Sequence, residues 1–148
     1  MDDRRHTWES EDTELSVTHS FAPDVAEIAG ARRAVRDQLA AWGLERDQMA
    51  LELAVSELVT NAIVHGRGRV DLCISLARGR VRLDVSDEGP GAAPGPDGGD
   101  GTTVGGWGLR LIDDMSDDWG TGREGDRAHV WMERRAEGRQ RDVGPPPV

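Results

Sequence analysis

Three stretches of the chain alternate apolar with polar residues at a period of two, which is typical of half-buried strands. They cover about 15–21, 70–76 and 81–85. The last two are separated by Arg78-Gly79, a pair that indicates a hairpin turn. A final strand is expected over about 128–134, so the chain should build a sheet.

Two other stretches place apolar residues three and four positions apart, the spacing of one helical face. The first helix is predicted over about 23–43, and Arg32 falls on its apolar seam. The second is predicted over about 45–65 and is stopped by Gly66 and Gly68. The first seam comprises Val25, Ile28, Val35, Leu39 and Trp42, and the second comprises Leu51, Val55, Leu58 and Ala62.

A long segment from residue 89 to 106 consists almost entirely of Gly, Pro, Asp, Ala and Thr and is too poor in apolar residues to pack. A loop of this length in a compact domain indicates a functional lid or disorder. The helical pattern returns at Gly108. This order of elements predicts an α+β sandwich, a mostly antiparallel sheet with helices on one face. We expect one domain over 14–135, with disordered segments at 1–13 and 136–148.

The composition narrows the class of protein. At 148 residues with a formal net charge of −10, the chain fits one globular domain whose acidity argues against direct nucleic-acid binding. No apolar run approaches the ~20 residues that span a membrane, and no secretion signal is recognisable, so a cytoplasmic location is expected. The only cysteine, Cys73, excludes an internal disulfide. Every basic position is Arg, which excludes mechanisms that need a lysine, such as a Walker-A phosphate site.

A polar row of Glu57, Asn61 and His65 runs beside the apolar seam of the second helix. Because residues four apart share a helical face, Glu57 and Asn61 can converge on one site. The alternatives are an ordinary solvated glutamate and an asparagine bonded to nearby backbone. We interpret His65 as structural, since a histidine at a helix end often caps carbonyl groups.

Two glycine clusters follow this polar row. Asp87 ends a strand and precedes Gly89-Pro90-Gly91, and the cluster at 105–109 opens a helix. An ionised aspartate only accepts hydrogen bonds, which suits an exocyclic amine. Backbone amides at a helix N-terminus suit phosphate oxygens. Taken alone, each cluster has the ordinary interpretation of a turn or a loop end.

Together and in this order, the three segments resemble the N, G1 and G2 boxes of the GHKL ATPase superfamily. They read ELVTNAIVH at 57–65, DEGPG at 87–91 and GGWGL at 105–109. Over about residues 15–133 the chain is most similar to the small bacterial anti-sigma-factor serine kinases of that superfamily. The resemblance implies a Bergerat-type two-layer sandwich with a glycine-rich ATP lid.

The resemblance also implies a role for each box in binding ATP with Mg²⁺. It implies that Glu57 is the general base acting on the attacking hydroxyl, and that Asn61 coordinates Mg²⁺ on the triphosphate. Asp87 would accept a hydrogen bond from the adenine amino group. The backbone around the nucleotide would come from Gly89, Gly91, Gly105, Gly106, Gly108 and Leu109.

The function implied is a serine-protein kinase that phosphorylates a STAS-type antagonist protein and sequesters a sigma factor. Arg32 matches a position where such kinases contact both partners, and Arg33 lies beside it; a solvated basic face is the alternative. A homodimer is compatible with the resemblance. The second hypothesis is a module of the same fold that holds a sigma factor or regulator without ATP turnover.

Two features depart from the pattern of these kinases. The lid carries Asp97 and Asp100, and residues 102–104 read TTV where a basic residue is common. In the last strand we expect His129 to stand where the family has a threonine that holds adenine through water. These departures favour the second hypothesis, whereas the acid and amide positions of the boxes favour catalysis.

Overall fold

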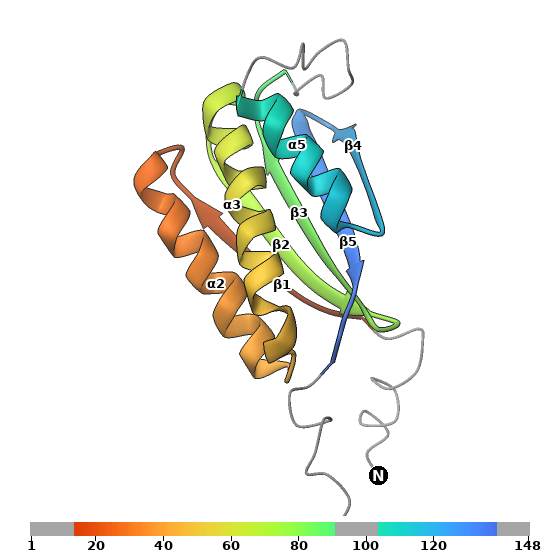
Figure 1. The fold of residues 1–148 in the computed structure, drawn as a ribbon. Coiled ribbons are helices and arrows are strands. Elements are labelled where there is room, and N and C mark those ends of the chain that lie inside the picture. The colour runs from red at the N-terminus through yellow and green to blue at the C-terminus, as the bar shows by residue number, and fades with distance from the viewer. Residues whose placement is uncertain (1–13, 91–103, 139–148) are drawn as a thin grey trace, which may run out of the picture.

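The computed structural model describes residues 14–90 and 104–138, which form a sheet with helices on one face (Figure 1). The strands lie in the order β1-β2-β3-β5-β4, and every neighbouring pair is antiparallel. They are β1 (Glu14–Phe21), β2 (Val70–Ala77), β3 (Arg80–Asp87), β4 (Asp118–Glu124) and β5 (Arg127–Arg135). The predicted α+β two-layer fold is confirmed.

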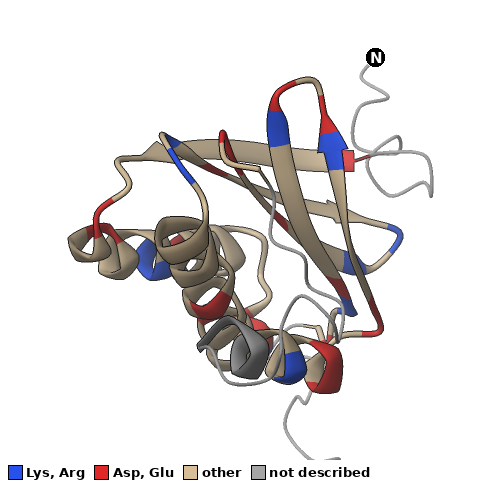
Figure 2. Ribbon diagram, turned by 90° about the horizontal axis from the view of Figure 1, so that it is seen from above, with Lys and Arg blue, Asp and Glu red and all other residues tan. Residues whose placement is uncertain are grey.

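The helical layer consists of α2, α3 and α5, and α3 lies between the other two (Figures 1 and 2). The helices are α2 (Ile28–Ala41), α3 (Gln48–His65) and α5 (Val104–Met115), and short 3-10 turns, η1 (Val25–Glu27) and η2 (Glu45–Asp47), precede the first two. Within the described residues, no helix is both long and apolar enough to cross a membrane.

The hairpin between β2 and β3 has the predicted turn. Arg78 and Gly79 have φ values of 56° and 75°. Two consecutive positive φ values match the twist of the flanking strands in a two-residue hairpin. The turn thereby fixes the register in which Asp71 pairs with Ser86, and β3 ends at Asp87.

The core lies between the helices and the sheet. The predicted seam of α3 is confirmed, because Leu51, Val55, Leu58 and Ala62 are all buried. In α2 the buried row is instead Ala31, Val35 and Leu39, spaced four apart. The prediction that Val25 and Arg32 lie on the apolar seam of the first helix is wrong. Val25 lies in η1 and is 63% exposed. Arg32 directly follows Ala31 but points away from the buried row, and its side chain is 51% exposed.

The last helix begins earlier than predicted. It starts at Val104 rather than at Gly108, so the second glycine cluster lies within the first turns of α5. Most of the predicted lid, including Gly91, Asp97 and Asp100, lies outside the described residues. So do the N-terminal segment and residues 139–148.

A buried carboxylate joins the start of α3 to the segment after β5. Asp47, at the start of α3, is 1% exposed. Both of its carboxylate oxygens accept from the backbone N–H of Glu137, at 2.9 and 3.0 Å. This contact holds the segment that follows β5 against the helical layer.

Candidate functional site

A small hollow lies where the C-terminal half of α3 meets the end of β3. Asn61 and Asp87 both line it, so the structure brings together the two polar residues predicted for the N and G1 boxes. The remaining lining residues are mostly apolar or small, and they are Leu58, Ala62, His65, Gly66, Val85, Ala128 and Val130. A polar group of a ligand in this hollow would therefore meet the side chains of Asn61 and Asp87, surrounded by mostly apolar residues.

Asp87 is 8% exposed and is held by backbone donors. Its Oδ1 accepts from the N–H of Gly89 at 2.6 Å and from the N–H of Arg67 at 3.2 Å. Both hydrogen bonds that Asp87 makes with described residues fall on Oδ1. Oδ2 is therefore the oxygen that can accept from an amino group of a ligand.

The turn after α3 packs directly on the turn after β3. A Cβ added to Gly66 would collide with the carboxyl group of Asp87, and a Cβ added to Gly68 would collide with Glu88. The N–H of Glu88 also donates to the carbonyl of Arg67, at 2.7 Å. From the sequence these glycines were predicted only to end the helix. That Gly66 admits Asp87 and Gly68 admits Glu88 was not predicted, although two glycines directly after the polar row were a signal.

Asn61 is 5% exposed. Among the described residues, the structure gives its side chain no hydrogen bond. The Asn61 carboxamide lines the hollow, where its oxygen can coordinate a cation and its amide N–H can donate. No group of three or more His, Cys, Asp or Glu suited to a metal occurs in the described part of the chain. Among the described residues, a cation beside Asn61 would have this amide oxygen as a ligand, and Mg²⁺ accepts such oxygen ligands.

Glu57 lies one helical turn before Asn61 on α3 and is half-buried. It does not line the hollow, so the structure separates it from the Asn61–Asp87 pair. Its carboxylate makes no hydrogen bond or ion pair with any described residue. Its carboxylate oxygens are therefore available to a group of a ligand or substrate.

The second glycine cluster contributes backbone rather than side chains. Gly105, Gly106 and Gly108 lie in the first turns of α5, whose first four N–H groups have no acceptor within the helix. Leu109 is buried and anchors this end of α5 to the interior. These amides can face an anion at the helix N-terminus.

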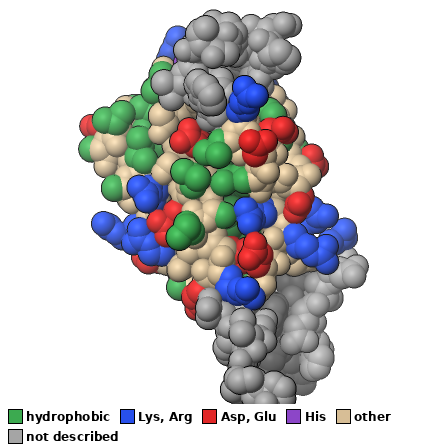
Figure 3. Space-filling view, in the orientation of Figure 1, with side chains coloured by type: hydrophobic (Ala, Val, Ile, Leu, Met, Phe, Trp, Pro, Cys, Tyr) green, Lys and Arg blue, Asp and Glu red, His purple; other side chains and the backbone are tan. Residues whose placement is uncertain are grey.

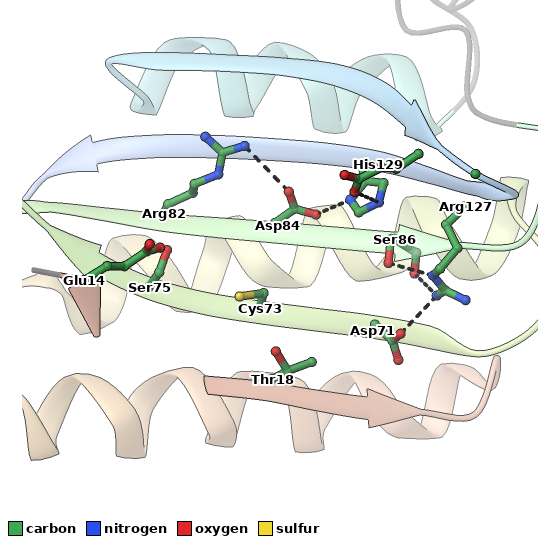
Figure 4. A pocket seen from close by; sticks show the side chains of 12 residues that line it. Glu14, Thr18, Asp71, Cys73, Ser75, Arg82, Asp84, Ser86, Arg127 and His129 are labelled. Carbon is green, nitrogen blue, oxygen red and sulfur yellow. Dashed lines mark hydrogen bonds and ion pairs between the residues drawn. The ribbon is translucent and has the colours of Figure 1, made fainter. Parts of the chain in front are cut away.

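His129 does not lie on the face of the sheet that carries Asp87, so the expectation that it stands at the threonine position is wrong. Neighbouring residues of a strand point to opposite faces. His129 faces the uncovered side, where its Nδ1 lies 2.7 Å from Asp84 Oδ1 (Figure 4). Ala128, which pairs with Asp87 across β3 and β5, lines the hollow instead.

The uncovered face of the sheet holds a shallow polar basin of about 630 Å³, which includes His129 and Arg127 (Figure 4). Arg127 donates to the hydroxyl and carbonyl oxygens of Ser86 and lies 3.4 Å from Asp71. The hydrogen bond from Arg69 to Asp71 lowers the pKa of that carboxyl, and Ser20 and Arg127 act in the same direction. The charges in this basin are largely paired with one another.

Arg32 lies far from the hollow, on a groove of about 700 Å³ between α2 and the start of α3. Its guanidinium is 3.8 Å from Glu52, which also holds Arg36 in a two-point ion pair. Met49, in the same groove, is 85% exposed. Arg33 is exposed but does not line the groove. On the helical face, hydrophobic side chains lie among charged ones (Figure 3).

Solved structures with the same fold include two bacterial proteins. The crystal structure of the RsbU and RsbW domains of Rv1364c from Mycobacterium tuberculosis matches with a TM-score of 0.64 at 20% identity. The match covers 82% of this chain and 32% of that one. The histidine kinase AdeS of Acinetobacter baumannii matches with a TM-score of 0.50 at 16% identity, covering 82% of this chain and 68% of that one. This chain thus spans about a third of the Rv1364c structure.

A comparison with curated proteins found no significant match. A comparison with models of protein families, in contrast, gives the family. The model of the histidine kinase-like ATPase domain matches residues 21–134, a range that includes the hollow and all three helices. The chain belongs to the histidine kinase-like ATPase family, the GHKL superfamily, whose fold and nucleotide-binding boxes the sequence indicated.

Proposed function

We propose that the chain binds Mg²⁺-ATP at the hollow, with the adenine amino group entering it, and is a serine-protein kinase of the anti-sigma-factor type. The observation that carries this proposal is the convergence of Asn61 and Asp87 on one hollow, each with a polar atom available to a ligand. In a GHKL domain these two positions suit Mg²⁺ and the adenine amino group, respectively. The amides at the start of α5 would receive the phosphates.

Glu57 is the proposed general base. It would accept the proton of a serine hydroxyl while the serine oxygen forms a bond to the γ-phosphorus and the bond between that phosphorus and the bridging oxygen of ADP breaks. Its place on α3 supports this role, since it lies one turn from Asn61 and outside the hollow proposed for the adenine amino group. Mg²⁺, when bound, would neutralise charge on the phosphates.

The proposed protein partners are a sigma factor and a STAS-type antagonist that carries the acceptor serine. The RsbW domain named in the Rv1364c structure supports a regulatory kinase of this kind. Arg32 and Arg33 are the proposed partner contacts, because both lie on the exposed side of α2. Direct binding to nucleic acid is not part of the proposal, since the net charge is −10.

The test combines calorimetric titration with a phosphoryl-transfer assay on an antagonist protein. The wild type should bind Mg²⁺-ATP and transfer phosphate to serine. Glu57→Ala should bind nucleotide normally but transfer phosphate ~10²–10⁴-fold more slowly. The matched control is Glu133→Ala, because Glu133 pairs with Arg82 on the sheet and lines neither the hollow nor the groove with Arg32. Wild-type transfer rates in Glu57→Ala would remove this carboxylate from the mechanism.

A partner-binding module without ATP turnover is the second candidate. Ala128 favours it, because the wall of the hollow beside Asp87 lacks the hydroxyl that the family's threonine would supply. This candidate predicts that the chain binds its sigma factor equally well with and without Mg²⁺-ATP. Nucleotide-dependent binding of that partner would contradict it.

A further inference from the structure

Three residues form a row across the end of the sheet next to the hollow. Asp87 on β3 pairs with Ala128 on β5, and Ala128 pairs with Arg123 on β4. Residues directly opposite each other in antiparallel strands project from the same face, so Arg123 projects on the side of the hollow. The middle residue of the row is the smallest, which leaves room for the long side chain of Arg123 to extend toward β3.

The Arg123 side chain ends on the turn that follows Asp87. Its guanidinium donates to the carbonyl oxygen of Gly89 at 3.0 Å. The N–H of the same glycine donates to Asp87 Oδ1 at 2.6 Å. Gly89 is therefore held on both sides, by Asp87 at its N–H and by Arg123 at its carbonyl.

The surroundings of Gly89 have no room for a side chain. A Cβ at Gly89 would lie 2.9 Å from both Asp87 Oδ1 and the Cα of Gly66. The turn is thus pressed between α3 and the Asp87 carboxylate. If the Gly89 carbonyl lost its donor, the glycine could rotate, and the hydrogen bond that orients Asp87 would weaken. The orientation of Asp87 decides where Oδ2 lies in the hollow.

We infer that Arg123 is a positioning residue of the nucleotide site, which fixes the Gly89 turn and through it the oxygen of Asp87 that selects adenine. The inference rests on the proposed binding of ATP in this hollow. Arg123 does not need to contact the nucleotide for this role. Its effect should fall on affinity and on the discrimination between adenine and guanine, rather than on the stability of the fold.

The experiment measures Mg²⁺-ATP and Mg²⁺-GTP affinities by calorimetry for the wild type, Arg123→Gln, Arg123→Lys and Arg80→Gln. Arg80→Gln is the control, since it removes the same charge from the exposed far end of β3, about 23 Å from Asp87. Thermal melting of each variant and hydrogen exchange at the Gly89 amide without nucleotide complete the set.

Arg123→Gln should bind ATP about three- to tenfold more weakly than Arg80→Gln does, with a smaller preference for ATP over GTP and faster exchange at Gly89. Arg123→Lys should recover part of each effect, because an ammonium group can also donate to the carbonyl. Melting temperatures should match that of Arg80→Gln.

Two results would overturn the inference alone: equal nucleotide preference and equal Gly89 exchange in Arg123→Gln and Arg80→Gln, or an affinity loss that only follows a lower melting temperature. If the wild type binds neither nucleotide, the proposed ATP site fails, and the positioning role fails with it.

Discussion

At the end of β3, the two oxygens of the Asp87 carboxylate have different roles. Asp87 Oδ1 accepts two backbone hydrogen bonds, and Oδ2 is left for the hollow. The substitution Asp87→Asn separates these roles, because the amide oxygen can keep both backbone bonds while the amide nitrogen replaces Oδ2. The variant then presents a donor to a ligand amino group that is itself a donor.

Asp87→Asn should therefore keep its fold but lose ~1–3 kcal/mol of ATP binding free energy. Calorimetric titration and thermal melting measure the two effects. Asp84→Asn is the matched control, since Asp84 lies on the same strand but faces the opposite side of the sheet. If the wild type binds ATP and GTP equally well, Asp87 does not select adenine.

Gly66 is the second residue on which the site depends. Gly66→Ala should displace the Asp87 carboxyl group, because the new Cβ would collide with it. We expect ATP affinity to fall about tenfold or more, a change of ~1.4 kcal/mol or more in binding free energy. Gly122→Ala is the control, because a Cβ there meets open space. Unchanged affinity in Gly66→Ala would show that the two turns move apart without cost to binding.

Among the elements, the strands and helices with regular patterns could be predicted from the sequence, whereas β4 could not be located. Its sequence, DWGTGRE, lacks alternating apolar residues. β4 lacks this pattern because it is an edge strand that pairs only with β5, and most of its residues are exposed. The order of the strands was equally hidden, since pairing between β3 and β5 depends on packing over long sequence distances.

The polar positions of the site could be predicted, because the N and G1 boxes carry them in a recognisable order. The contacts that hold them could not. The approach of Gly66 to Asp87 and the reach of Arg123 to Gly89 join segments that lie 21 and 34 residues apart, distances that no local pattern encodes. The face of His129 was mistaken because a shift of one residue along a strand reverses its direction.

An ion pair beside the junction of β1 and β2 should make the fold sensitive to acid. The pKa of Asp71 lies below the ordinary value of 3.8, chiefly because of its hydrogen bond from Arg69. A lowered carboxyl pKa stabilises the fold above pH 3.8, and this contribution disappears as the pH falls through the lowered folded-state pKa. Thermal melting should show Asp71→Asn to be less stable than the wild type above pH 3.8.

The difference between Asp71→Asn and the wild type should then shrink at progressively lower pH, where both side chains are uncharged. Arg69→Gln should remove much of the same pH-dependent contribution, because Arg69 is the main cause of the lowered pKa. A stability difference that stays constant with pH would mean that Asp71 acts through its shape or its hydrogen bonds and not through its charge.

In the molecule as a whole, α3 connects two surfaces. Its first turns line the groove with Arg32, and its last turns line the hollow with Asn61. Met49 and Asn61 are about 18 Å apart along the helix axis. Glu57, the proposed base, lies between the two surfaces and directly follows Ser56, which lines the groove. A partner seated on the groove would therefore reach the middle of α3.

This arrangement predicts that partner binding and nucleotide binding can be separated. Arg32→Ala should weaken binding of the sigma factor or antagonist and leave ATP affinity unchanged, whereas Asn61→Ala should weaken Mg²⁺-dependent ATP binding and retain the partner. Calorimetry with each ligand on both variants measures this. Loss of ATP binding in Arg32→Ala would show that the two ends of α3 are coupled.

The strand order also constrains how the chain can reach its folded state. β4 precedes β5 in the chain but joins the sheet only through β5. Neither β3 nor β4 can therefore form its pairing with β5 until the chain has been made as far as residue 135. During synthesis, β3 would wait with one unpaired edge while α5 and β4 emerge, a period in which an open strand can recruit another chain. The last strand, β5, thus completes the sheet by joining β4 to β3. The folding rate should depend on this late pairing between β3 and β5 more than on formation of the helices.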